Sequence, residues 1–131
     1  MRKLTYILIL GLNIFLFSCK QETATPCEQV KSASALIQDF PDSLKVGTAF
    51  PVTVNYILEN DCGDFDHFDI SQNGKSFLVT LMTKYTGCSC KLELIERQTN
   101  FDIDVDFPGN YEFSFSLEDG DLDTYSLVVY E

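Results

Sequence analysis

Tryptophan is absent from this sequence of 131 residues, histidine occurs once, and basic residues are scarce. Nine lysines and arginines face twenty aspartates and glutamates. Proteins that bind nucleic acid place clusters of basic side chains against the phosphates, so this balance argues against a nucleic-acid partner. It argues equally against adhesion to an anionic membrane through charge alone. The simplest role of so much negative charge is to keep the protein soluble.

The single histidine limits the catalytic devices that the chain can form. A Ser-His-Asp or Cys-His arrangement would have to use His67, and no Gly-x-Ser-x-Gly turn is present to expose a nucleophile. His67 lies between Asp66 and Asp69, a setting that is typical of a solvated residue. We therefore expect no enzymatic activity, no catalytic residue and no cofactor. A small hydrolase that uses carboxylates near His67 is the alternative.

Long apolar runs are also lacking. The longest, from Leu4 to Phe17, has about fourteen residues, whereas a helix that spans a bilayer needs about 20. The positive residues Arg2 and Lys3 precede it, and a small residue, Ser18, follows it. This order of features indicates a secretory signal peptide. We expect residues 1–18 to be removed from the mature protein.

The signal ends in Leu16-Phe17-Ser18-Cys19, which resembles the lipobox of bacterial lipoproteins. The resemblance implies that the thiol of Cys19 receives a diacylglyceryl group, that the chain is cut before Cys19, and that the new amine is acylated. Two or more acyl chains anchor a protein stably in a membrane. Lys20 stands where an aspartate would favour the inner membrane. The resemblance therefore points to the outer membrane or cell surface, as in envelope lipoproteins of the Bacteroidetes type.

Five cysteines are an odd number for an exported chain, and lipidation of Cys19 leaves an even four. Four cysteines in an oxidising compartment predict two disulfides. Cys88 and Cys90 are too close for an easy mutual bridge. Two pairings remain: Cys27–Cys88 with Cys62–Cys90, or Cys27–Cys90 with Cys62–Cys88. We favour the first because Cys62 and Cys90 each adjoin a predicted turn. Zinc is disfavoured, since paired C-x-x-C spacing is absent.

After the signal, apolar and polar residues alternate almost throughout, which is the period of a β-strand. β-branched and aromatic residues fill these stretches, as strands prefer. The stretches that predict strands are 50–58, 77–82, 92–94, 101–107, 111–116 and 125–130, with a short edge strand at 32–38. Asn73-Gly74 and Asp119-Gly120 predict hairpin turns, and Pro108-Gly109 predicts a break between strands.

About seven short strands predict an all-β fold in which two sheets form a sandwich. Gly109-x-Tyr111-x-Phe113 resembles the entry to the F strand of immunoglobulin-like domains, with 101–107 and 125–130 at the E and G positions. Phe113 replaces the cysteine of that pattern, and the usual tryptophan is missing. The resemblance therefore implies a general Ig-like β-sandwich over residues 33–131. Residues 19–32 are expected to be the lipidated N-terminus and tether.

Acidic turns offer candidate calcium ligands. Asp119, Asp121 and Asp123 carry oxygen atoms at alternate positions, as in the first half of an EF-hand loop. The glycine and the closing acid of such a loop are missing, with Thr124 and Tyr130 at those places. Charged turns that keep the ends of a sheet soluble are the simpler interpretation, and we expect no metal. A second acidic turn is predicted at 61–66.

Other acids and rings are candidates for contact with a partner. The acids at 102, 104 and 106 share one strand face, where they would blunt edge pairing or meet a basic protein. The rings of Phe65, Phe68 and Tyr85 could stack on a glycan, although core packing is the simpler role. Tyr130 should point away from the core if Val129 points inward.

These features together predict a lipid-anchored envelope protein with a non-catalytic binding or accessory role. Its membrane contact would be the acyl chains on Cys19, and its ligand a protein or a glycan. Loss of Arg2 and Lys3 with the signal leaves seven basic and twenty acidic residues, a net charge of −13. A structural spacer that binds nothing is a further alternative.

Overall fold

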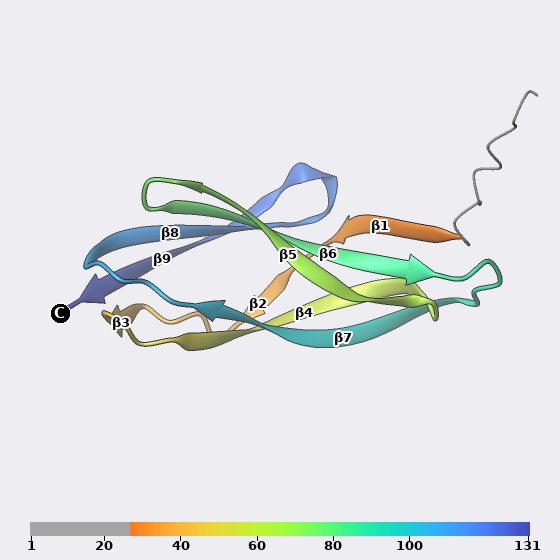
Figure 1. The fold of residues 1–131 in the computed structure, drawn as a ribbon, viewed down its shortest axis with the longest axis horizontal. Coiled ribbons are helices and arrows are strands. Elements are labelled where there is room, and N and C mark those ends of the chain that lie inside the picture. Colours follow the sequence, from red (N-terminus) through yellow and green to blue (C-terminus); the bar gives the residue numbers. More distant parts are fainter. Residues whose placement is uncertain (1–26) are drawn as a thin grey trace, which may run out of the picture.

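The computed structural model describes residues 27–131, so the predicted signal, Cys19 and the first part of the predicted tether lie outside the described residues. The described part consists of strands and one short 3-10 turn (Figure 1). They are β1 (Glu28–Ala33), β2 (Leu36–Gln38), β3 (Ser43–Lys45), β4 (Phe50–Asn60), β5 (Gly63–Asn73), β6 (Ser76–Thr86), β7 (Leu92–Ile103), β8 (Gly109–Ser116), η1 (Glu118–Gly120) and β9 (Leu122–Tyr130).

Two sheets form a β-sandwich, as the sequence predicted. In the six-stranded sheet, β5 pairs along nearly all of one edge of β6, while β8 and β1 share the other edge. β8 pairs with residues 76–79 of β6 and β1 with residues 81–86. β9 and β3 complete this sheet, and β2, β4 and β7 form the three-stranded sheet. The β6–β8 and β3–β9 pairs are parallel, whereas the other pairs are antiparallel.

The core lies between the sheets and follows from the alternating pattern. Successive side chains of a strand point to opposite faces, so one face of each long strand is buried. In β4 the buried side chains are Val52, Val54, Tyr56 and Leu58. Across the sandwich, the buried ring of Phe115 in β8 meets Phe101 of β7 edge to face, with centroids 5.5 Å apart. Such aromatic pairs add to the burial energy that holds the sheets together.

β5 corrects the prediction of an acidic turn at 61–66. Only Asp61 and Cys62 form the turn, and the two acids at 64 and 66 belong to the strand. A β-bulge at Asp66 shifts the register between Phe65 and His67. The extra residue lets Phe65 and Phe68, three positions apart, both face the core. This spacing breaks the period of two, so the sequence pattern did not reveal the strand.

β7 corrects the predicted strands at 92–94 and 101–107. They are parts of one strand that ends at Ile103. Residues 96–100 are polar because β7 lies at the edge of the sheet, and the alternation is lost there. Asp104 and Asp106 therefore lie beyond the strand and do not share its face with Asp102.

The sandwich begins earlier than the predicted residue 33. Residues 28–33 form β1, which pairs with the last part of β6, so residues 28–32 belong to the domain and not to a tether. Their polar composition reflects a strand with little burial.

The immunoglobulin-like pattern around Tyr111 has a structural counterpart. The Tyr111 hydroxyl donates a hydrogen bond of 2.9 Å to the carbonyl of Phe107, as the tyrosine corner of those domains does. The two parallel pairs, β3–β9 and β6–β8, differ from the antiparallel sheets of an immunoglobulin domain. The resemblance therefore holds for the sandwich and for this corner.

Candidate functional site

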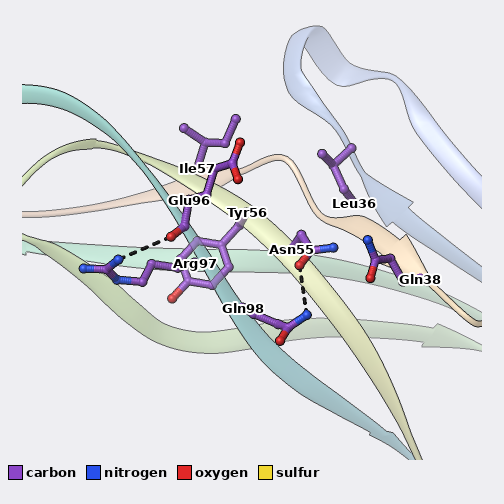
Figure 2. A pocket seen from close by; sticks show the side chains of 8 residues that line it. All are labelled: Leu36, Gln38, Asn55, Tyr56, Ile57, Glu96, Arg97 and Gln98. Atoms are coloured by element: carbon purple, nitrogen blue, oxygen red, sulfur yellow. Dashed lines mark hydrogen bonds between the residues drawn. The ribbon is translucent and has the colours of Figure 1, made fainter.

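A groove runs across the outer face of the three-stranded sheet. Its volume is about 570 Å³, and it is open to solvent. Its lining comes from β2, β4 and β7: Leu36, Gln38, Asn55, Tyr56, Ile57, Glu96, Arg97 and Gln98 (Figure 2). This groove is the candidate functional site because it combines uncharged polar groups, aliphatic surface and one edge of a sheet.

Strand register brings the groove residues together. Asn55 of β4 lies opposite Leu36 on one side and Gln98 on the other. The side chains of directly paired residues point to the same face of a sheet, and here that face is the outer one. Gln98 Nε2 donates a hydrogen bond of 3.1 Å to Asn55 Oδ1 (Figure 2). This bond holds two amides in place and leaves their other donor and acceptor atoms for a ligand.

Aliphatic side chains supply the apolar part of the groove. Leu36 is 49% exposed and Ile57 is 43% exposed. Ile57 also borders a second hollow of about 310 Å³, which reaches Leu94 and the ring of Tyr85. The exposed apolar surface therefore continues from β2 across β4 to β7.

Tyr56 and Arg97 also line the groove. They lie opposite each other in the β4–β7 pair, and their side chains start from the inner face of the sheet. Burial, followed by the nearby Asp64 carboxylate, raises the pKa of the Tyr56 phenol above its ordinary value. Arg97 Nη1 donates to the carbonyl of Glu96 over 3.3 Å (Figure 2). Tyr56 thus stays neutral at ordinary pH, and the guanidinium of Arg97 is held by a backbone oxygen.

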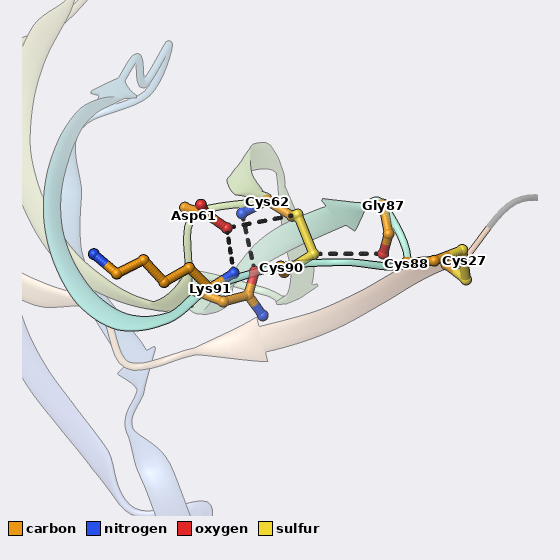
Figure 3. The surroundings of a disulfide bond; sticks show 8 residues. Cys27, Asp61, Cys62, Gly87, Cys88, Cys90 and Lys91 are labelled. Carbon is orange, nitrogen blue, oxygen red and sulfur yellow. Dashed lines mark hydrogen bonds between the residues drawn. A yellow bond between two sulfur atoms is a disulfide. The ribbon is translucent and has the colours of Figure 1, made fainter.

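The four cysteines of the described residues, Cys27, Cys62, Cys88 and Cys90, lie together at one end of the sandwich (Figure 3). Disulfides join Cys27 to Cys88 and Cys62 to Cys90, with Cα–Cα distances of 5.1 and 5.6 Å. These are the pairs that the sequence analysis favoured. Asp61 Oδ1 accepts a hydrogen bond of 2.8 Å from the amide of Lys91, which fixes the turn beside the second disulfide.

Potential metal ligands do not form a convincing centre in residues 27–131. Asp61, Cys62 and Cys90 have ligand atoms within 4.8 Å of one another, but both sulfurs are already bonded to each other. The predicted calcium ligands around η1 are not grouped in this way. One of them, Asp123, accepts a hydrogen bond of 2.6 Å from the Tyr125 hydroxyl.

His67 lies on β5, and its side chain is 56% exposed. Its Nδ1 atom is 2.7 Å from Asp66 Oδ2. No serine or threonine hydroxyl is recorded in hydrogen-bond contact with this ring in the described part of the chain. The contact is an exposed hydrogen bond between neighbouring residues, which agrees with the solvated residue expected from the sequence.

The aromatic candidates divide into core and surface. Phe65 and Phe68 pack against the core, and Tyr85 is only 6% exposed. The Tyr85 hydroxyl accepts a hydrogen bond of 3.2 Å from the amide of Glu59. Tyr130 is 53% exposed whereas Val129 is 3% exposed, so the predicted outward direction of Tyr130 is confirmed.

The groove itself was not identified from the sequence. Asn55 and Gln98 are 43 positions apart, and only their register makes them neighbours. The polar residues at 53 and 55, on alternate positions of a strand otherwise rich in apolar residues, were the one available signal. Within residues 27–131, the structure has no helix of the length and apolarity that crossing a membrane requires.

Comparison with known proteins adds one finding. The sequence model of the family described as "ORF11 beta-sandwich domain" matches residues 52–127. The match begins in β4 and ends in β9, so it includes strands of both sheets and agrees with the observed fold. No curated protein and no solved structure matches the chain.

Proposed function

The chain belongs to the ORF11 beta-sandwich domain family, and from this premise we propose that it is a lipid-anchored envelope protein that binds a protein or glycan without catalysis. The observation that carries the binding role is the groove over β2, β4 and β7. Its amides can donate and accept hydrogen bonds, and its aliphatic side chains can be desolvated by a ligand. Such a lining suits recognition, and it contains no nucleophile beside a base.

The proposed location rests on the sequence before residue 27. The lipobox-like tetrad would place acyl chains on Cys19, eight positions before Cys27. Two disulfides favour an oxidising compartment outside the cytosol. A tether of this length would keep the disulfide end of the sandwich near the membrane, with the body of the domain available to a partner.

Crosslinking in the native cell tests the binding role. A photoreactive residue would replace Ile57, which is exposed in the groove, and a control would replace Ser126 on β9. Because the groove is the proposed site, we expect an adduct from position 57 and a weaker or absent adduct from position 126. Mass spectrometry would identify the attached protein or glycan. If position 57 captures nothing from intact cells, the spacer alternative is favoured and the proposed function fails.

A further inference from the structure

β7 presents a free edge of the three-stranded sheet. It has 12 residues, and within residues 27–131 its only strand partner is β4. In an antiparallel pair, alternate residues direct their N–H and C=O groups away from the partner. Figure 1 shows the middle part of β7 along the lower border of the molecule. A row of backbone donors and acceptors is therefore available to another extended chain.

The other sheet edges are less suited to pairing. β1 has 6 residues and β2 and β3 have 3 each, and the long edge strand β5 is interrupted by the bulge at Asp66. Short strands and bulges are the usual means by which proteins protect their edges. β7 keeps a regular register with β4 from Ile95 to Ile103, and this stretch contains no glycine or proline. It is the longest regular edge in the described residues.

The charge around this edge selects the kind of chain that can pair with it. Glu96 and Asp102 are exposed on β7, and the two acids at 104 and 106 follow directly. None of these four carboxylates takes part in an ion pair within the described residues. Arg97 is the one basic side chain of the strand, and it donates to a carbonyl oxygen. The unpaired negative charge complements a basic segment.

Besides the charges, an added strand could contact two other features near β7, namely two exposed leucines and the groove. Leu92 and Leu94 are 87% and 76% exposed, so aliphatic surface lies at the end of β7 near the disulfides. Glu96 and Gln98 line the groove. A strand added beside β7 would thus extend the floor of the groove, and every second side chain of that strand would lie on the groove side.

We propose that β7 receives an extended basic segment of a partner protein as a fourth strand of the β2–β4–β7 sheet. This inference rests on the proposed binding role and names the partner chemistry for it. Backbone hydrogen bonds along residues 95–103 provide the affinity, as in other cases of strand addition. Lysine or arginine side chains on the groove side meet Glu96 and Asp102, and an aliphatic side chain meets Leu94.

Synthetic peptides test the strand pairing. The probe is a nine-residue peptide of alternating lysine and valine, and two controls match it. One replaces lysine by glutamate, and the other carries N-methyl groups on the amides of one edge, so its charge is unchanged but that edge cannot donate. We expect the lysine peptide to bind the soluble domain and to protect the β7 amides from hydrogen exchange. Equal binding of the N-methylated peptide, or of the glutamate peptide, would overturn the proposal.

Charge variants test the assignment to β7. Glu96→Lys with Asp102→Lys should weaken binding about two- to thirtyfold, since two exposed ion pairs with the basic segment are lost. Glu112→Lys on β8 with Asp121→Lys, just before β9, changes the net charge equally away from the three-stranded sheet, and it should leave the affinity within about twofold. Arg97→Glu should strengthen binding. If both double variants lost the same affinity for the peptide, general charge attraction would explain the binding and the assignment to β7 would be refuted.

The outcomes also separate this inference from the proposed function. A glycan adduct, or a protein adduct from position 57 without any peptide binding to β7, would refute strand addition and support the binding role. Capture of nothing at position 57 would remove the binding role itself.

Discussion

Tyr125 shows how burial and one hydrogen bond change the chemistry of a single residue. Its ring stacks on Phe40 with centroids 4.7 Å apart, and its hydroxyl donates to Asp123. Burial, and then the bond to Asp123, raise the pKa of Tyr125 from 10.0 to about 12. Because the folded state holds this proton more tightly, the stabilisation is present below pH 10.0 and is lost as the pH rises toward about 12.

Asp123→Asn should bring the pKa of Tyr125 down toward its ordinary value, because the charged acceptor is lost while most of the burial remains. The measurement is the phenolate absorbance during a pH titration, with Tyr125→Phe to assign the transition to this residue. An unchanged titration in Asp123→Asn would contradict the role of the carboxylate.

Phe115 is the residue at which a core mutation should be most damaging. It is 0% exposed and contacts the rings of Phe101 in one sheet and Tyr125 in the other. Phe115→Ala should lower the free energy of unfolding by about 3–5 kcal/mol, since it leaves a cavity that the neighbours fill only in part. Urea denaturation measures this loss. The matched control is Phe107→Ala, because Phe107 is 71% exposed, and its effect should stay within about 0.5 kcal/mol. Equal effects would place Phe115 outside the core.

At the scale of elements, the connection into β8 depends on the corner formed by Tyr111. Its hydroxyl donates a hydrogen bond to the carbonyl of Phe107. Phe107 lies between β7 and β8, so its carbonyl is not paired with another strand. Tyr111→Phe keeps the ring and removes this bond, so it should cost about 0.5–1.5 kcal/mol of unfolding free energy. Ser114→Ala on the same strand is the control, because it also removes one hydrogen bond, the exposed one of 2.9 Å between the Ser114 and Thr124 hydroxyls. A loss in Ser114→Ala as large as in Tyr111→Phe would argue against a special role for the corner.

The disulfides join elements that are far apart in the sequence. Cys27–Cys88 closes a separation of 61 residues, from the start of β1 to the loop before β7, and Cys62–Cys90 closes a separation of 28. Replacing either pair by serine should lower the unfolding free energy by about 3–4 kcal/mol if the main effect is on the entropy of the unfolded chain.

Denaturation curves of the two double-serine variants test this expectation, and peptide mapping without reduction tests the pairing itself. Peptides that link Cys27 to Cys90 would contradict the observed connectivity. Serine variants as stable as the native protein would show that the bridges do not support the fold.

At the scale of the whole molecule, the proposed anchor and the sandwich are separable. The described domain begins at the start of β1 and builds its own core, so it should fold without lipid. Cys19→Ser should therefore abolish incorporation of labelled palmitate and move the folded protein from the membrane to the soluble fraction, because no acyl chain would remain. Circular dichroism of the released protein checks the fold. Palmitate labelling that persists in Cys19→Ser would refute the lipobox assignment.

Composition and alternation were sufficient for the fold class and for the strands with a clear period of two. The pattern predicted β4, β8 and β9 because each has one face in the core and one in solvent, and the Asp119-Gly120 turn between β8 and β9 was correct. It missed β5, where a bulge breaks the period, and it divided β7, whose middle is polar on both faces. In both strands, contacts with residues far away in the sequence determine which positions are polar, so the local pattern does not reveal the strand.

The sequence by itself determined the all-β sandwich and the inward direction of most apolar side chains, because these depend on alternation. It left two cysteine pairings open, and the structure has the favoured one. Only the tertiary structure decided which strands share a sheet, that β6 and β8 run parallel, and that β7 is a free edge among residues 27–131. It also decided the groove, since Asn55, Gln98 and Leu36 become neighbours through the register of β2, β4 and β7. Register is set by the packing of the whole core, and no local segment contains that information.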